Sequence, residues 1–423
     1  MLLRPSGRLI RALTLTTAFA AFAALAAPAT STAAKPAVVT LSMAQVGSPG
    51  NPAAAIVPFT DGIYQSCATA PQGDPPCQAV GGVSYPYDIG QLEVTVKQYV
   101  GFLNTVDPTG RDKHNLFSAD ESSTEWPKYG QINERTRAPS GRHYSIAYPE
   151  WADKPYGFAN FLRTARFANS VTNGKLISKR TVASGGFTYV VYKVRLSRNS
   201  ERGMYDMRNP KTTRRRATGF VVPSQDEWIK AAYFDPTGGG TFSYWKYPTN
   251  PGTFFDQPTQ TSPDPTAPNT ATLNPITGDV TNSSTQPLAI YHGTSFPTWC
   301  PSQVSTNTCD TVNPLHLSAS NYQKLYQGSL GTVGQSKTLG PWGTLDQGGN
   351  AVEWMDTITP PPAGKKGARV WRRLHGGVPN APGYQLWLSA IGLQPQDNKF
   401  YDLIYPWLGF RIGVVGDLQV KKG

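Results

Sequence analysis

Three segments of the chain place apolar residues at the spacing of one helix face. The first segment follows Thr95, which has Gln98 three positions later, the spacing of a capping box. A second helix is predicted over Asn160–Val171. A third begins at Ser224, where Glu227 completes another capping box ahead of further apolar residues. Each helix is expected to bury its apolar face.

Apolar, β-branched and aromatic residues gather in five other segments, which are predicted as strands. The first lies just after residue 35, and the others are Val83–Val94, Phe187–Leu196, Val370–Leu374 and Phe410–Val415. Strands and helices are interspersed, and long polar stretches dotted with aromatic residues separate them. This order predicts an α+β fold in which irregular coil is the majority.

The composition excludes several classes of fold. Only 16% of the residues are charged, 11% are aromatic, and the chain has 41 glycines and 37 prolines. These values exclude a coiled coil, a helical bundle and a disordered acidic tail, and the glycines lack the three-residue period of collagen. We therefore expect one turn-rich domain whose aromatic side chains supply much of the core. Five tryptophans of the C-terminal third either belong to this core or line a cleft for a sugar or peptide: Trp342, Trp354, Trp371, Trp387 and Trp407.

The N-terminus has the features of a secretory signal peptide. Three arginines precede an apolar run over Leu13–Ala27, and small residues follow it. An uncleaved membrane anchor is the alternative, but the run is short for a span of about 20 residues. We expect residues 1–34 to be a signal peptide and residues 35–423 to form one domain, which is extracellular or in the cell envelope. No later stretch is predicted to cross a membrane.

The four cysteines fall into two close pairs, Cys67 with Cys77 and Cys300 with Cys309. An oxidising compartment favours disulfides, and of the three possible connectivities we expect the two local loops. Metal binding is disfavoured, because neither spacing is C-x-x-C. The second pair lies within residues 235–340, which are rich in Pro, Thr, Gly, Asn and Ser. We expect this segment to be an ordered, irregular arm of the domain.

Two basic runs contribute to the formal net charge of +12. One is Lys211–Arg216, and the other comprises Lys365, Lys366, Arg369, Arg372 and Arg373. Either run could contact a polyanion such as an acidic glycan. Solvated loops are the simpler interpretation. Because the chain has no recognisable nucleic-acid module, we expect no nucleic-acid partner.

Four motifs occur in order along the chain. They are Ile89-Gly90-x-x-Glu93-Val94-Thr95-x-x-Gln98-Tyr99, Val222-Pro223-Ser224-x-x-Glu227-Trp228, Gly348-Gly349-Asn350-Ala351-Val352-Glu353-Trp354, and Arg373-Leu374-His375-Gly376-Gly377 with Gly409-Phe410-Arg411-Ile412 after it. In this order and spacing they resemble the formylglycine-generating enzyme family, whose shared unit is also called the sulfatase-modifying-factor domain. The resemblance covers residues from about 40 to 415.

The resemblance implies a single, coil-rich α+β domain with a C-type-lectin-like formylglycine-generating-enzyme fold. Catalytic members of the family oxidise a cysteine of a sulfatase to formylglycine, with molecular oxygen and a copper(I) ion held by two cysteines. Those cysteines follow the position of Gly376-Gly377, where this chain has Val378–Trp387 without a cysteine. Copper(I) needs thiolate ligands, so copper is not expected. A second branch holds iron with three histidines, whereas the five histidines here are scattered.

The family also binds calcium, and this part of the pattern is retained. The resemblance assigns the calcium loop to Gly349, Asn350, Ala351 and Glu353, through side chains and main-chain carbonyls, which are the hard oxygen ligands that calcium prefers. The alternative is that Glu353 only caps a turn or forms a salt bridge. A second family loop has its nearest match at Ser320-Asn321-Tyr322, which adds Asn321 as a candidate ligand.

These observations favour a secreted, non-catalytic protein that binds an extracellular peptide, protein or glycan on a calcium-stabilised scaffold. The alternative is a divergent formylglycine-generating-type oxidase, and a third possibility is a purely structural surface module. His375, just before the paired glycines, is expected to be a satisfied strand histidine. A ligand or proton carrier of a divergent site is its alternative role.

Overall fold

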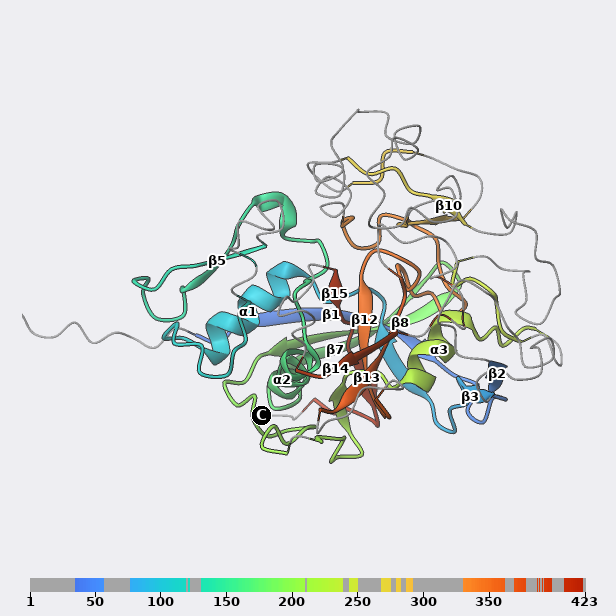
Figure 1. The fold of residues 1–423 in the computed structure, drawn as a ribbon, viewed down its shortest axis with the longest axis horizontal. Coiled ribbons are helices and arrows are strands. Elements are labelled where there is room, and N and C mark those ends of the chain that lie inside the picture. The colour runs from blue at the N-terminus through green and yellow to red at the C-terminus, as the bar shows by residue number, and fades with distance from the viewer. Residues whose placement is uncertain are drawn as a thin grey trace, which may run out of the picture. The chain divides into compact units, whose positions relative to one another are not determined.

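A six-stranded sheet is the larger of the two main sheets in the computed structural model (Figure 1). Its strands follow the order β7-β8-β1-β4-β16-β9, and every neighbouring pair is antiparallel. β7 and β9 are therefore its edges. The strands are β1 (Val38–Val46), β4 (Tyr87–Gly90), β7 (Lys175–Ser184), β8 (Phe187–Arg195), β9 (Gly219–Val221) and β16 (Gly413–Val415).

A second sheet has four strands in the order β14-β13-β12-β15, with the last pair parallel. Its strands are β12 (Val352–Thr359), β13 (Trp371–His375), β14 (Gly392–Pro395) and β15 (Leu408–Gly409). Three further sheets have two strands each. They pair β2 (Ala54–Ile56) with β3 (Gln78–Val80), β5 (Ile132–Glu134) with β6 (Tyr144–Ile146), and β10 (Asn269–Thr270) with β11 (Leu288–Ala289).

The structure describes sixteen stretches of the chain, all within one compact unit, Ala33–Gly423. They are residues 35–56, 77–118, 121, 131–209, 211–238, 243–249, 268–274, 279–282, 287–291, 330–361, 369–377, 386, 388, 390, 392–397 and 407–420. No helix among these stretches is both long and apolar enough to span a bilayer.

The three predicted helices are present: α1 (Val96–Val106), α2 (Phe161–Thr172) and α3 (Gln225–Tyr233), together with a short 3-10 helix, η2 (Pro149–Trp151). Both predicted capping boxes form. Thr95 and Gln98 exchange side-chain and backbone hydrogen bonds at α1, and Ser224 and Glu227 do so at α3. Asn160 caps α2 by accepting a hydrogen bond from the backbone amide of Arg163. These local bonds satisfy amides that a helix start leaves without partners.

The helices connect the two main sheets. α2 contacts both β9 of the six-stranded sheet and β12 of the four-stranded sheet, and α3 also contacts β12. Figure 1 accordingly shows the orange β12 between α2 and α3. α1 packs against α2 and β1. One hydrophobic core therefore extends from the six-stranded sheet through the helices to β12 and β13.

Aromatic rings fill the centre of this core, as the composition predicts. Tyr99 stacks on Tyr156 with ring centroids 3.6 Å apart, and Phe102, Phe167 and Phe410 surround the pair. Among the five C-terminal tryptophans, Trp354 is fully buried, Trp342, Trp371 and Trp407 are partly buried, and Trp387 lies outside the described residues. Trp354 belongs to the core, where its indole N–H donates to the carbonyl of Ala159.

Several strand predictions differ from the structure in extent. The strand expected over Val83–Val94 is confined to β4, because Pro86 precedes it and the chain turns towards α1 after Gly90. Phe410–Val415 is not one strand, since only Gly413–Val415 pairs in the six-stranded sheet. β7 was not predicted, because its residues are mostly polar and exposed along an edge.

Three residues of the predicted solvated basic runs are not solvated. Arg373 is only 9% exposed and donates to the side chain of Gln78 at 3.2 Å. Arg214 pairs with Glu227 at 2.6 Å and with Asp356 at 2.5 Å. Arg372 is fully buried in β13, with its guanidinium 3.6 Å from the ring centroid of Phe161. The charges of Arg214 and Arg372 are compensated by carboxylates and by an aromatic face, respectively, which a local basic pattern does not reveal. Arg369, in contrast, is exposed and pairs with Asp397.

Cys77 is disulfide-bonded. Cys67, Cys300 and Cys309 lie outside the described residues, so the expected pairing stays a prediction. The same holds for most of the predicted arm over residues 235–340. Its described parts include β10 and β11, and two of its residues, Ile290 and Gly331, attach directly to the predicted calcium loop, as shown below.

Candidate functional site

The predicted calcium loop is a sharp backbone turn that holds the arm. Gly349 has φ +91°, and a Cβ atom at this position would lie 2.2 Å from the carbonyl oxygen of Ile290, so only glycine fits. The next amide, of Asn350, donates to that same carbonyl at 2.8 Å. The side-chain oxygen of Asn350 accepts from the amide of Gly331 at 2.9 Å. The turn therefore anchors two separate points of the arm.

Glu353 lies at the second position of β12, fully buried. Its carboxylate accepts hydrogen bonds from the guanidinium of Arg411 at 2.6, 2.7 and 2.9 Å, and from the indole N–H of Trp228 at 2.8 Å. Neither partner is exposed. The alternative considered for Glu353, a salt bridge, is thus present in the structure.

Glu93 is a second buried carboxylate beside this turn, and its role was not recognised although it belongs to the first motif. One of its oxygens accepts from the side-chain amide of Asn350 at 3.1 Å. The other, Oε2, has no hydrogen-bond partner in the described part of the chain. Burial, together with the nearby carboxylate of Asp346, raises the pKa of Glu93 well above its usual range. Asp346 is itself fully buried and accepts from the hydroxyl of Ser336 at 2.6 Å.

Three buried carboxylates therefore surround a single cation, Arg411, and the excess negative charge would suit a divalent cation. The free oxygen belongs to Glu93, whereas both oxygens of Glu353 already accept hydrogen bonds. No group of three or more His, Cys, Asp or Glu residues arranged to hold a metal occurs in the described stretches. A calcium ion here would have to complete its shell with carbonyls, such as those of Gly349 and Ala351, and water. Asn321 lies outside the described residues, and calcium stays a prediction.

His375 is a buried strand histidine with both ring nitrogens occupied. Nε2 lies 3.1 Å from the carbonyl oxygen of Leu388, and Nδ1 accepts from the amide of Gly376 at 2.9 Å. The ring packs on Trp228 with centroids 4.6 Å apart. This arrangement fixes the neutral tautomer that carries its proton on Nε2, and burial lowers the pKa of His375 to about 4. Residues 378–385, which directly follow Gly377, lie outside the described residues.

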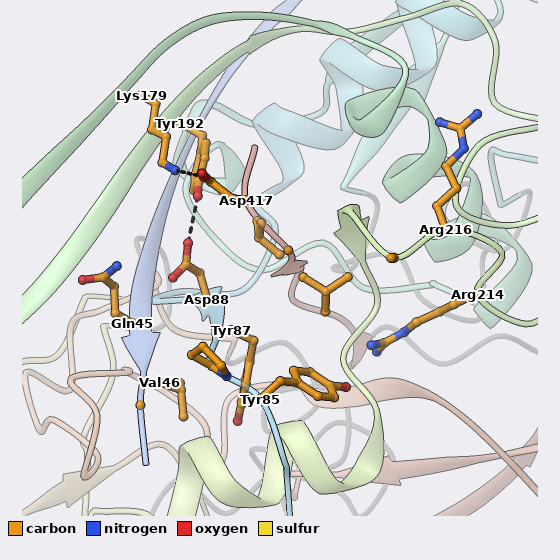
Figure 2. Close-up of a pocket in the computed structure, with 16 residues that line it drawn as sticks. Gln45, Val46, Tyr85, Tyr87, Asp88, Lys179, Tyr192, Arg214, Arg216 and Asp417 are labelled. Carbon is orange, nitrogen blue, oxygen red and sulfur yellow. Dashed lines mark hydrogen bonds and ion pairs between the residues drawn. The ribbon is translucent and has the colours of Figure 1, made fainter. Parts of the chain in front are cut away.

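A surface hollow of about 820 Å³ shares no lining residue with this buried cluster and was not predicted from the sequence (Figure 2). Its floor comes from the ends of β1, β4 and β16, and the segment around Arg214 and Arg216 forms one wall. A volume of this size is in the range of roughly 300–1,000 Å³ that small-molecule sites occupy.

Tyr85 stands at one end of the hollow and is 42% exposed. Its hydroxyl donates to Glu227 at 2.8 Å. The guanidinium of Arg214 donates two further hydrogen bonds to Glu227, of 2.6 and 2.7 Å. Burial and the Glu227 carboxylate raise the pKa of Tyr85, so the phenol keeps its proton and remains a donor. The ring also meets Tyr87 edge to face, with centroids 6.4 Å apart. An exposed aromatic ring is thus held in one orientation from beneath.

The opposite end of the hollow is polar. Lys179 pairs with Asp417 at 2.8 Å, and the hydroxyl of Tyr192 donates to Asp88 at 2.8 Å, as the dashed lines of Figure 2 show. Gln45 is exposed beside them. Tyr85 and Asp88 are close in sequence, but the other groups come from five separate segments. No local motif could have indicated that they meet.

No family model matches the chain, and no curated protein matches it. Three solved structures have some likeness to it. Treponema denticola variable protein 1 is 15% identical with a TM-score of 0.40, over 90% of this chain and 100% of that one. CarF is 14% identical with a TM-score of 0.33, over 90% and 99%. PvdO from Pseudomonas aeruginosa is 11% identical with a TM-score of 0.35, over 91% and 98%. Similarity this low carries no argument about function.

Replacing one partner of the Glu353–Arg411 pair should destabilise the protein more than the pairwise interaction alone would suggest. Arg411→Met or Glu353→Gln leaves a buried charge without its partner, and each is expected to lower the free energy of unfolding by about 3–5 kcal/mol. The double variant should lose clearly less than the sum of the two single losses. Urea unfolding of all three variants at one calcium concentration measures this.

The matched control for that cycle is Arg369→Met, which removes an exposed pair and should cost about 0–1 kcal/mol. Strictly additive losses in the double variant, or losses no larger than that of the control, would contradict a coupled buried pair.

The protein should lose stability in acid partly through His375. The unfolded side chain takes up a proton near pH 6.5 and the folded one only near pH 4, so this loss sets in as the pH falls below 6.5 and is complete near pH 4. The difference between these two pKa values corresponds to a loss of about 3 kcal/mol in the free energy of unfolding. His375→Gln keeps a donor and an acceptor but cannot titrate. Urea midpoints from pH 4 to 7 should therefore fall less steeply in the variant, and parallel curves would refute the assignment.

Proposed function

We propose that the protein is a secreted, non-catalytic binding protein with a formylglycine-generating-enzyme-like fold, and that its ligand occupies the hollow beside Tyr85. The four ordered motifs support the fold. The signal-peptide pattern supports an extracellular or cell-envelope location. The ligand classes that remain are peptide, protein and glycan.

The observation that carries the proposal is the immobilised, half-exposed ring of Tyr85 over a hollow of about 820 Å³. A surface aromatic ring that is fixed in advance loses little conformational freedom when a ligand packs on it. The groups that fix the ring lie beneath it. The Tyr85 hydroxyl donates to Glu227, Glu227 pairs with Arg214, and Arg214 also pairs with Asp356. Polar side chains at the other end could then select the ligand.

The chain's own sequence weighs against the oxidase alternative. A copper(I) centre of the family type requires two thiolates after Gly376-Gly377, and Val378–Trp387 supplies none. The nearby His375 is also occupied on both ring nitrogens by backbone groups. His375 therefore has no free ring nitrogen to offer in place of the missing sulfur ligands.

Calcium would stabilise this scaffold through the buried carboxylate cluster. We propose that the free oxygen of Glu93 and the side-chain oxygen of Asn350 contribute to holding the ion, with main-chain carbonyls of Gly349 and Ala351. Bound calcium would supply positive charge to a cluster in which three carboxylates share one arginine. It would thereby strengthen the turn that anchors the arm at Ile290 and Gly331.

Glu93→Gln tests the calcium proposal. In calcium buffer the wild-type melting temperature should lie above its value in chelator, and the variant should lose most of that difference. In chelator the variant should be about as stable as the wild type, because the raised pKa of Glu93 already favours its neutral, protonated form, which a neutral amide resembles. Differential scanning fluorimetry in both buffers measures this.

Glu121→Gln is the matched control, because Glu121 is another buried carboxylate with one oxygen unpaired in the described residues. Its calcium-dependent increase should equal that of the wild type. An unchanged increase in Glu93→Gln would eliminate Glu93 as a ligand, and no increase in the wild type would eliminate the calcium proposal.

Binding to immobilised glycans and peptides tests the main proposal. The mature wild-type protein should bind a subset of them, and Tyr85→Ala should lose that binding while it melts at a similar temperature. Absence of any Tyr85-dependent ligand would overturn the proposal. Copper-dependent oxygen uptake with conversion of a cysteine-containing sulfatase peptide to formylglycine would instead establish the oxidase.

A further inference from the structure

We infer that the hollow is a glycan site, in which Tyr85 stacks on the flat face of a neutral, equatorially substituted sugar ring. This inference rests on the proposed function, because it selects one ligand class for the same hollow. The juxtaposition that carries it is an immobilised aromatic face at one end and hydroxyl-binding groups at the other (Figure 2).

The fixed ring is the first element of the argument. A sugar ring whose substituents are all equatorial presents a flat array of C–H bonds, which packs on an aromatic face without needing a directional partner. Tyr85 offers such a face because its hydroxyl is turned inwards to Glu227, 2.8 Å away. The ring therefore contributes an apolar surface to a site that is otherwise polar.

The backbone of the hollow argues against an extended peptide. The floor is made by β1, β4 and β16, each of which has a neighbouring strand on both sides in the sheet. The lining residues of these strands are paired on at least one side, as in Val46 with Tyr87 and Val415 with Gly219, and Val414 is paired on both. A peptide that recognises a protein by adding a strand needs a free edge, and this floor does not offer one.

The charges in the hollow argue against a polyanion. Three cations line it, but Lys179 pairs with Asp417, and Arg214 pairs with Glu227 and Asp356. Asp88 adds one more carboxylate. Arg216 is exposed and makes one long contact, 3.5 Å, with Asn173. Lys179 and Arg214 are therefore neutralised by their partners, and Arg216 and Asp88 leave one charge of each sign along the lining. No cluster of unpaired cations is thus present in the described lining to attract phosphate or sulfate groups.

The remaining polar groups suit hydroxyls. The side chain of Asp417 is 66% exposed and its carboxylate is an acceptor beside the ammonium donor of Lys179. Gln45 adds an amide that can both donate and accept. Neighbouring hydroxyls of a sugar present donors and acceptors in the same close spacing. A neutral oligosaccharide can therefore satisfy both ends of the hollow at once.

Isothermal titration calorimetry with cellotetraose and with tetra-N-acetylchitotetraose tests the inference. Both probes are neutral and equatorially substituted. At least one should bind the wild-type protein, and Tyr85→Ala should weaken that binding about tenfold or more, the scale of a lost aromatic contact. Tyr85→Phe keeps the ring but loses the hydroxyl tether, so it should weaken binding by a smaller factor, about two- to fivefold.

Tyr148→Ala is the matched control, since Tyr148 is 49% exposed and does not line the hollow. Its affinity should equal that of the wild type. Asp417→Asn, at the opposite end, should weaken binding severalfold and provides a second variant if Tyr85→Ala does not fold.

The outcomes separate this inference from the function on which it depends. Failure of both oligosaccharides, with Tyr85-dependent binding of a peptide from a displayed library, would overturn the glycan assignment and leave the binding function intact. Oligosaccharide binding that survives both Tyr85→Ala and Asp417→Asn would also overturn it, because the sugar would then bind elsewhere. Failure of oligosaccharides and peptides alike would overturn both proposals.

Discussion

The buried ion pair between Glu353 and Arg411 is the interaction on which the rest of the structure depends. Arg411 also donates hydrogen bonds to the carbonyls of Gly90 and Leu345, at 2.8 and 3.1 Å. Glu353 accepts in addition from Trp228 of α3. A single pair thus joins the start of β12, the end of β4, the helix α3 and the C-terminal strand region. Because burying two charges is costly, such a pair needs further hydrogen bonds to its remaining donors and acceptors. Here these bonds fix the positions of five segments, since the segment of Leu345 is also bound.

The turn beside this pair shows how a glycine can organise an irregular region. The arm has little regular structure in its described parts, so it needs specific points of attachment. Gly349 permits one, because its missing side chain lets the carbonyl of Ile290 approach the backbone closely. Asn350 then holds Ile290, Gly331 and Glu93 with its amide and side chain. The motif that the resemblance assigns to calcium is therefore also the structural anchor of the arm, whether or not an ion is present.

How much could be predicted depended on the range of each interaction. The helices were predictable because their capping residues lie three positions apart, as at Thr95 and Gln98. Strand extents were less accurate, since β7 is mostly polar and gains its order from pairing with β8 rather than from its own pattern. Glu353 and Arg411 belong to two of the sequence motifs, yet no local pattern indicates that these two residues, 58 positions apart, form an ion pair. The unpaired oxygen of Glu93 could not be predicted either, because it results from the packing of segments distant in sequence.

The hollow also depends on contacts between residues far apart in the sequence, and Glu227 makes several of them. Glu227 was recognised as a helix-capping residue, and it does cap α3 by accepting from the amide of Ser224 at 2.7 Å. The same carboxylate also binds Arg214 and the hydroxyl of Tyr85, which is 142 positions away in the chain. One buried side chain therefore starts a helix, neutralises part of a basic run and orients a surface aromatic ring. Because these roles share one group, a change at Glu227 would disturb fold and hollow together, whereas a change at Tyr85 acts on the exposed ring alone. The surface residue, and not the conspicuous motif residue, is where the binding function can be separated from the stability of the fold.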